Sequence, residues 1–222
     1  MPQTIQAEPI APPVEDSHAE AWTAYFDRVY RAAGQRAELL PWADLRANPS
    51  LVTWLNAEAP RLVRPGGSVA VVGCGLGDDA GEIAARGYET VAFDVAAPAV
   101  EWAKRRHPEV EFVVADLFNL PVRLHRRFDL VAEVYTLQSL HPDLRERAVE
   151  GVVSLAKPHG IVMVIARGRA GDEALPDVPP YSFTREELSG LFARAGFHPV
   201  RDPDEFEDSA GVPRIRAAFQ RR

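Results

Sequence analysis

The sequence VAVVGCGLGDDA, residues 69–80, decides the fold of this chain. Its first four residues are apolar and mostly β-branched, as in a strand of a parallel sheet that is buried on both faces. Three glycines follow at alternate positions, and a helix-compatible segment, 80–86, comes next. Strand, glycine turn and helix in this order predict a nucleotide-type pocket at the carboxyl end of a parallel strand.

The two carboxylates behind the glycines indicate which kind of nucleotide the turn would accept. A dinucleotide fingerprint needs a third glycine, and that place falls on Asp78 or, in the looser register, on Ala80. Asp78 and Asp79 would repel a pyrophosphate at the helix start, and no Gly-Lys-Ser/Thr follows to cradle phosphates. We therefore expect a ligand with a nucleoside, no phosphate and a positive charge. S-adenosylmethionine (SAM), a sulfonium with an ammonium group, meets this description.

The glycine turn resembles the first motif of the class I SAM-dependent methyltransferases. The resemblance implies that four residues of the turn lie against SAM: Gly73, Cys74, Gly75 and Gly77. That family usually has an acid two residues before the first glycine, where this chain has Val71. We expect Asp78 and Asp79 to supply the negative charge instead. N-capping of the next helix is the alternative role for either residue, and the two roles are compatible.

Two further strand patterns, 89–95 and 110–117, each end in or near an acid. Asp94 lies about 20 residues after the first glycine, the interval at which a carboxylate meets the ribose hydroxyls. We place Asp94 and Val95 there, with capping of the helix 96–106 as the alternative for Asp94. In the resembled family the third strand end reads the adenine, which implies this role for Asp116 and Leu117. An ordinary turn at the strand end is the alternative for Asp116.

The fourth strand pattern, 128–135, should direct its end toward the transferred methyl group. We expect Glu133 to contact the cofactor, and Tyr135 and His141 are the candidate catalytic residues. Tyr135 would orient the acceptor. His141 would serve as a general base, because its unperturbed pKa lies near neutrality. The alternative for His141 is an exposed cap at the helix start that Leu140-His141-Pro142 indicates.

The alternation of strand and helix patterns predicts an α/β fold, a Rossmann-like, doubly wound sheet with helices on both faces. A fifth strand, 160–166, follows a segment, 155–160, that resembles the family's leucine-lysine-proline-glycine turn. The sixth and seventh strands are expected near 199–201 and 214–220, with a long hairpin loop, 202–213, between them. The seventh should run antiparallel to the other strands of the mostly parallel sheet.

An aromatic segment precedes the sheet. A helix over 19–36 carries Trp22, Tyr25 and Tyr30 at helical spacing, and Trp42 follows it. This segment resembles the N-terminal part of the thiopurine- and tellurite-type branch, which implies a cover over the cofactor, with Trp42 against the sulfonium. Plain packing onto the core is the alternative. The expected organisation is a disordered tail (1–17), an N-terminal helical lid (18–60) and a SAM-binding domain (61–222).

Composition narrows the class of protein. The chain has 222 residues, 46% of them hydrophobic, which is enough for a sizeable core. A formal net charge of −7 with scattered basic residues argues against nucleic-acid binding. No apolar run approaches about 18 residues, so no membrane span is expected. A single cysteine in a tight turn and the absence of a signal-peptide pattern favour a soluble cytoplasmic protein.

The function predicted from these patterns is transfer of a methyl group from SAM to O, N or S of a small soluble molecule, with S-adenosylhomocysteine as the product. We expect no metal, no nucleic-acid or membrane partner, and a monomer or homodimer. Two alternatives stay open. One is a catalytically inactive SAM-fold protein that binds or regulates. The other is a nicotinamide-dependent oxidoreductase, which the carboxylates behind the glycine turn disfavour.

Overall fold

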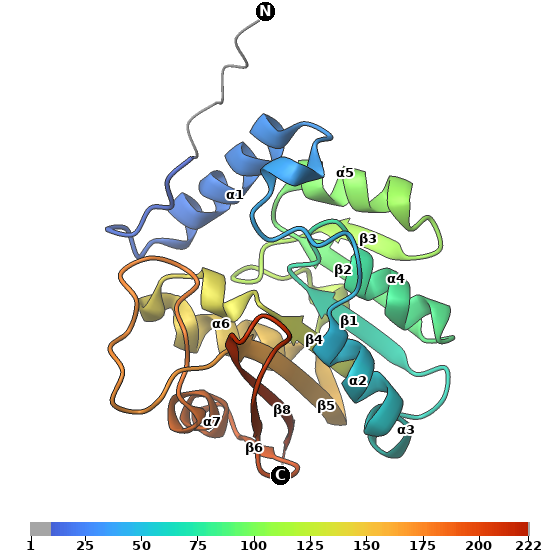
Figure 1. Cartoon of the computed structure of the whole chain (residues 1–222). Coiled ribbons are helices and arrows are strands. Elements are labelled where there is room, and N and C mark those ends of the chain that lie inside the picture. The colour runs from blue at the N-terminus through green and yellow to red at the C-terminus, as the bar shows by residue number, and fades with distance from the viewer. Residues whose placement is uncertain (1–9, 222) are drawn as a thin grey trace, which may run out of the picture.

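The computed structural model describes residues 10–221, which form one eight-stranded sheet with helices on both faces (Figure 1). The strands are β1 (Ser68–Val72), β2 (Glu89–Asp94), β3 (Glu111–Val114), β4 (Phe128–Val134), β5 (Ala156–Arg167), β6 (Phe197–Pro199), β7 (Asp204–Glu207) and β8 (Pro213–Arg221). The α-helices are α1 (Ala19–Ala33), α2 (Pro49–Ala57), α3 (Ala59–Leu62), α4 (Asp78–Ala85), α5 (Ala97–Arg106), α6 (Arg145–Ser154) and α7 (Arg185–Arg194). Short 3-10 turns are η1 (Ala37–Leu39), η2 (Val122–Leu124), η3 (Leu137–Ser139) and η4 (Pro142–Leu144).

The strand order β3-β2-β1-β4-β5-β8-β6 puts the reversal of the chain between β1 and β4. Strands β1 to β5 pair in parallel, and β8 pairs antiparallel with β5, as the sequence predicts. The chain moves outward from β1 through β2 to β3 and then returns to β4 on the other side. In open α/β sheets this switch point leaves a crevice at the carboxyl ends of the strands, where ligands bind.

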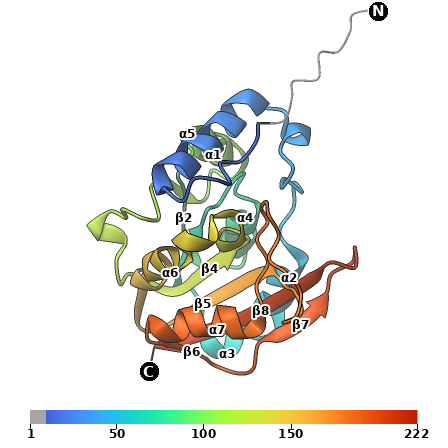
Figure 2. The same cartoon turned by 90° about the vertical axis from the view of Figure 1, so that its left-hand side faces the viewer.

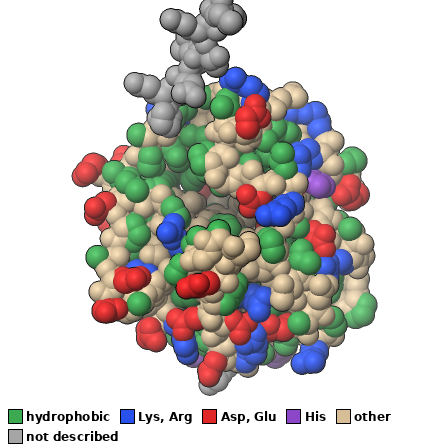
Figure 3. All heavy atoms as spheres, in the orientation of Figure 1, with side chains coloured by type: hydrophobic (Ala, Val, Ile, Leu, Met, Phe, Trp, Pro, Cys, Tyr) green, Lys and Arg blue, Asp and Glu red, His purple; other side chains and the backbone are tan. Residues whose placement is uncertain are grey.

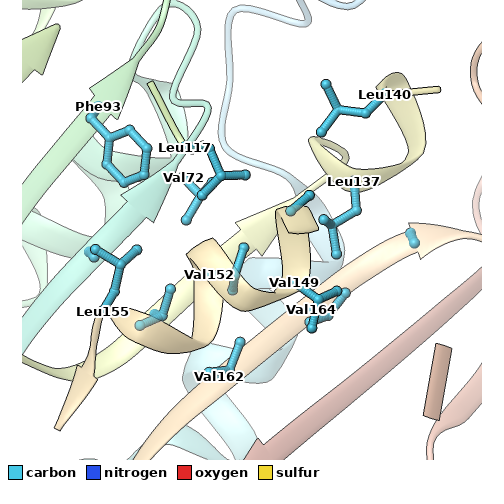
Figure 4. Close-up of a cluster of buried hydrophobic side chains, with 14 of the residues drawn as sticks. Val72, Phe93, Leu117, Leu137, Leu140, Val149, Val152, Leu155, Val162 and Val164 are labelled. Atoms are coloured by element: carbon cyan, nitrogen blue, oxygen red, sulfur yellow. The ribbon is translucent and has the colours of Figure 1, made fainter. Parts of the chain in front are cut away.

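Side chains alternate between the two faces of the sheet and form two cores. On one face, α1, α6 and α7 pack with residues such as Val72 and Val164, and on the other, α2, α3 and α4 pack with Val71 and Ile165. Figures 1 and 2 show the two helix layers, with α6 and α7 on one side and α2 to α4 on the other. In Figure 4 the α6 side chains meet those of β5 and of the neighbouring strands. Each buried Val or Leu contributes about 1.5–3 kcal/mol relative to an exposed one.

The C-terminal part of the sheet corrects one expectation. The segment 202–213 is not a loop throughout, because it contains β7, which pairs with β8. Strands β6 and β7 lie beside successive parts of β8, so they act as one interrupted edge strand. Pro199 and Pro203 flank the interruption, and proline, which lacks an N–H, is tolerated at such an edge. The sheet therefore has eight strands where seven were expected.

The N-terminal segment is divided between the two faces of the sheet. Of the expected tail, residues 1–9 lie outside the described residues, whereas 10–17 lie against the body of the protein. Ile10 packs on the core, and the indole N–H of Trp22 donates to the Asp16 carbonyl at 2.8 Å. Helix α1 belongs to the core on the α6 side, and α2 belongs to the core on the α4 side. Within residues 10–221, no helix combines the length and apolarity that crossing a membrane requires.

Candidate active site

A cavity of about 770 Å³ lies at the switch point, within the size range of small-molecule sites. Its walls come from the glycine turn, from the carboxyl ends of β2, β3, β4 and β5, from the start of β8, and from α1 with the segment that follows it. Figure 3 shows a hollow near the centre of this face, with acidic and basic side chains at its rim. The parts of the chain that the sequence assigned to the cofactor therefore meet at one place.

The glycine turn brings backbone close to this cavity. Gly73 and Gly75 both line it and both have positive φ, of 57° and 52°. A Cβ on Gly75 would lie 3.0 Å from the Tyr30 hydroxyl, so a side chain would fill space between the turn and α1. Cys74 lines the cavity as well, and burial raises the pKa of its thiol well above the usual value. A neutral thiol in a tight turn fits the role of a small wall residue.

Gly77 differs from its neighbours because it is not among the residues that line the cavity. It is the N-cap of α4, with a positive φ of 86°. A Cβ there would lie 2.8 Å from the Phe112 ring, so the glycine allows α4 to approach β3. Gly77 thus shapes the turn from behind and does not face the cavity as expected.

Asp94 lies at the cavity wall and is not the N-cap of α5, a position that Ala96 holds without a side-chain hydrogen bond. Its carboxylate accepts hydrogen bonds from the backbone N–H of Gly75 and of Ala96, each at 2.9 Å, so it joins the glycine turn to the start of α5. It also lines the cavity, as does Val95. Burial raises the pKa of Asp94, and the two N–H donors oppose that rise. A carboxylate has about four acceptor positions, so further hydrogen bonds to a ligand are open to it.

The two aspartates behind the turn have different surroundings. Asp78 forms an ion pair with Arg106 at the end of α5. Asp79 accepts a hydrogen bond from the Asn48 N–H at 2.7 Å and has no ion-pair partner within residues 10–221. Burial raises the pKa of Asp79 to about 6. Both line the cavity, but only the Asp79 charge is uncompensated by a cation.

Neither aspartate is the N-cap of α4, so that alternative is wrong. The cap position belongs to Gly77, and no side chain accepts from the first N–H groups. Asp78 and Asp79 are instead the first two residues of the helix, where negative charge is favourable near the positive end of the helix dipole.

Asp116 and Leu117 both line the cavity, beyond the end of β3. The strand ends at Val114, three residues before the predicted limit, and Asp116 starts a turn. Its carboxylate accepts from the Phe118 N–H at 2.8 Å. The turn alternative is therefore observed, and it leaves Asp116 at the cavity wall.

Aromatic residues close the cavity on two sides. Tyr135 follows β4 with a positive φ of 68° and lines the cavity, and the Arg214 guanidinium lies 4.6 Å from the centre of its ring. Trp42 lines it as well, and its indole N–H donates to the Tyr30 hydroxyl at 2.9 Å. With 41% of its surface exposed, Trp42 covers the cavity without being part of the core.

Comparisons with known proteins agree with this geometry. Residues 69–160 match the family model of the methyltransferase domain. The 1,6-didemethyltoxoflavin-N1-methyltransferase of Burkholderia thailandensis, solved with 1,6-didemethyltoxoflavin and S-adenosylhomocysteine bound, is 23% identical with a TM-score of 0.75, over 99% of this chain and 98% of that chain. A TehB-like SAM-dependent methyltransferase from Corynebacterium glutamicum is 19% identical with a TM-score of 0.57, over 92% and 98%.

Residues 69–160 therefore match a methyltransferase domain, and the whole chain shares the fold of SAM-dependent methyltransferases. The resemblance drawn from the glycine motif is confirmed, and so is the fold class. A further similar structure, the [4+2]-cyclase SpnF, is 19% identical with a TM-score of 0.61, over 73% of this chain and 77% of that chain. Because a protein named for another reaction shares the fold, the chemistry of this methyltransferase domain has to be argued from its own site.

Besides Gly77, two expected site residues lie outside the cavity walls. Glu133 is fully buried, because strand alternation turns it into the core under η3. There it accepts from the Leu137 N–H at 2.8 Å, and burial raises its pKa to about 7. His141 is the N-cap of η4, where its Nδ1 accepts from the Asp143 N–H at 3.2 Å. The capping alternative for His141 is what the structure shows.

Sequence reasoning missed several polar cavity residues, among them Asn48, Arg167 and Arg214. Asn48 precedes Pro49 and caps α2, which is a recognisable helix-start signal, but its link to Asp79 is not visible in the sequence. Arg167 and Arg214 come together only through the pairing of β5 with β8. Residues 10–221 hold no group of three His, Cys, Asp or Glu side chains that could bind a metal ion.

Proposed function

We propose that this chain transfers the methyl group of SAM to O, N or S of a small molecule that enters the cavity. The observation that carries the proposal is that Gly75, Asp94 and Asp116, which follow three neighbouring strands, line one cavity. SAM, when bound, supplies an electrophilic methyl group on sulfur with a good leaving group. The protein then has to align the acceptor with that methyl group and exclude water.

The residues present fit the cofactor. The glycine turn allows close approach of its methionine chain, and Asp94 would accept from the ribose hydroxyls. The Asp116–Leu117 turn would receive the adenine. Asp79 would hold the methionine ammonium, in place of the acid that Val71 replaces, because it lies half-buried at the cavity wall and has no counter-cation.

The acceptor would lie beside Tyr135 and Trp42. Their rings, with the aromatic residues of α1, make that part of the cavity apolar and shield it from water. The relative from Burkholderia thailandensis holds 1,6-didemethyltoxoflavin together with S-adenosylhomocysteine, which supports a small organic molecule as the acceptor here. Neither Glu133 nor His141 faces the cavity, so we assign neither a role in proton transfer.

Calorimetry with SAM, S-adenosylhomocysteine and NADH tests the cofactor. We expect the first two to bind and NADH not to, because a pyrophosphate would meet Asp79 at the start of α4. Binding of NADH without SAM would favour the oxidoreductase alternative.

Catalysis is tested separately, by formation of S-adenosylhomocysteine when SAM and a small-molecule extract are added. SAM binding without any product over a broad set of acceptors would favour the inactive, regulatory alternative.

A further inference from the structure

The charges around the cavity are separated along the sheet. The carboxylates of Asp79, Asp94 and Asp116 follow β1, β2 and β3, whereas Arg167 ends β5 and Arg214 lies at the start of β8. In the strand order, these two groups lie on opposite sides of β4. The segment before α2 adds one charge of each sign to the rim, Asp44 and Arg46.

Arg167 and Arg214 are direct partners in the antiparallel pairing of β5 with β8. Like charges in this arrangement repel each other unless counter-charges are present. Arg214 has one, because its guanidinium lies 2.7 Å from the Asp208 carboxylate and also stacks over Tyr135. Arg167 has no ion-pair partner among residues 10–221.

The Arg167 backbone is well fixed although its charge is uncompensated. Its N–H donates to the side-chain oxygen of Gln138, and its carbonyl accepts from the Phe183 N–H at 2.9 Å. The Arg167 backbone is thus fixed at the cavity wall, and its guanidinium carries the paired N–H donors that suit a bidentate contact to a carboxylate.

We propose that Arg167 binds a carboxylate of the methyl acceptor, so that the acceptor is a small aromatic acid. This inference rests on the proposed function. The cofactor contacts proposed above run from the glycine turn of β1 toward β3, away from β5. Two strand spacings, about 10 Å, separate the ends of β1 and β5. Arg167 therefore lies on the acceptor side of the methyl group, next to the aromatic wall.

The test uses calorimetry on the protein saturated with S-adenosylhomocysteine. The probes are three pairs of an acid and its neutral amide: benzoic, 2-hydroxybenzoic and nicotinic acid, each with its amide. We expect at least one acid to bind about tenfold more tightly than its amide, since charged hydrogen bonds are the stronger ones. Arg167→Gln should reduce that preference to within about twofold, and Arg167→Lys should keep part of it.

Arg105→Gln is the matched control, because it removes the same charge from an exposed position of α5 that does not line the cavity. It should leave the preference for the acids intact, and melting temperatures should show that all the variants are folded. If the wild type prefers none of the three acids over its amide, the proposal is overturned. This outcome includes weak or absent binding of both members of a pair. An unchanged preference in Arg167→Gln overturns it as well.

A second arm separates the acceptor from the other source of a carboxylate, the methionine part of the cofactor. S-adenosylhomocysteine has this group and 5′-methylthioadenosine lacks it. The proposal requires Arg167→Gln to bind both with wild-type affinity. Loss of S-adenosylhomocysteine affinity alone would assign Arg167 to the cofactor and overturn the proposal. If S-adenosylhomocysteine fails to bind the wild type, the proposed function itself fails, and this inference fails with it.

Discussion

Asp79 shows how surroundings divide two adjacent residues of the same type. Asp78 is neutralised by Arg106, whereas Asp79 is half-buried at the cavity wall with a single backbone N–H donor. The sequence predicts both as site residues and could not rank them, because Arg106 lies 28 positions away and comes close only through the packing of α4 and α5. The choice between the two acids was set by tertiary contacts.

The pKa of about 6 makes the role of Asp79 testable by pH. The ammonium of SAM favours the ionised carboxylate, so SAM affinity should rise by up to about tenfold between pH 5 and pH 7. Isothermal titration across this range measures the effect. Asp79→Asn should flatten the profile. 5′-Methylthioadenosine has the ribose but no ammonium, so its pH profile reports any contribution from Asp94. A similar rise in affinity with this ligand would contradict the assignment of the ammonium to Asp79.

The same residue should affect stability in the opposite direction. Its pKa is raised on folding, so the folded, ligand-free protein binds more protons than the unfolded chain between pH 4 and 6. The contribution of Asp79 to the free energy of unfolding therefore falls as the pH rises through this window. Urea denaturation at pH 5 and pH 7 should show a smaller drop for Asp79→Asn than for the wild type.

Asp94→Asn tests the ribose contact. The amide keeps an oxygen for the Ala96 N–H but loses the charge, so SAM binding should weaken by about 1–3 kcal/mol. Calorimetry measures this against Asp172→Asn, the same change at an exposed loop position. Equal affinity of the two variants would remove Asp94 from the site.

At the scale of elements, a substitution in the glycine turn tests most directly whether SAM binds there. Gly75→Val puts a branched side chain at a φ of 52° and at 3.0 Å from the Tyr30 hydroxyl. We expect it to abolish SAM binding, measured by calorimetry, because the chain fills the space of the ligand and strains the turn. Gly171→Val, at an open loop position, is the control. Normal affinity in Gly75→Val would contradict the site.

Most elements were predictable because their patterns are local. Strands such as β1 are continuous apolar runs, and the parallel strands each lead to a helix or turn signal, so the alternating α/β architecture was predictable. Strand β7 was missed because Asp204–Glu207, an acidic edge segment with Phe206 as its one apolar residue, has no hydrophobic run. The end of the strand near Glu133 was predicted, but the direction of the Glu133 side chain was not. A shift of one residue along a strand moves a side chain from the cavity to the core.

At the scale of the whole molecule, ligand binding should be visible as stability. S-adenosylhomocysteine at 100 times its dissociation constant should add about 2.7 kcal/mol to the free energy of unfolding and raise the melting temperature by about 5–11 °C. NADH at the same concentration should cause no shift. Differential scanning fluorimetry provides the measurement, and equal shifts for both ligands would contradict a preference for SAM.

The position of α1 affects how a ligand can enter and leave the cavity. Trp22 and Tyr30, 1% and 3% exposed, tie this helix to the same core as β5 and α6, so it cannot swing away while the domain stays folded. Trp42 belongs to the segment 41–46 of the cavity wall and is held by one hydrogen bond to the Tyr30 hydroxyl, so we expect this segment to move when a ligand enters or leaves. Tyr30→Phe removes that hydrogen bond and keeps the ring. It should shorten the residence time of S-adenosylhomocysteine, measured by stopped-flow release.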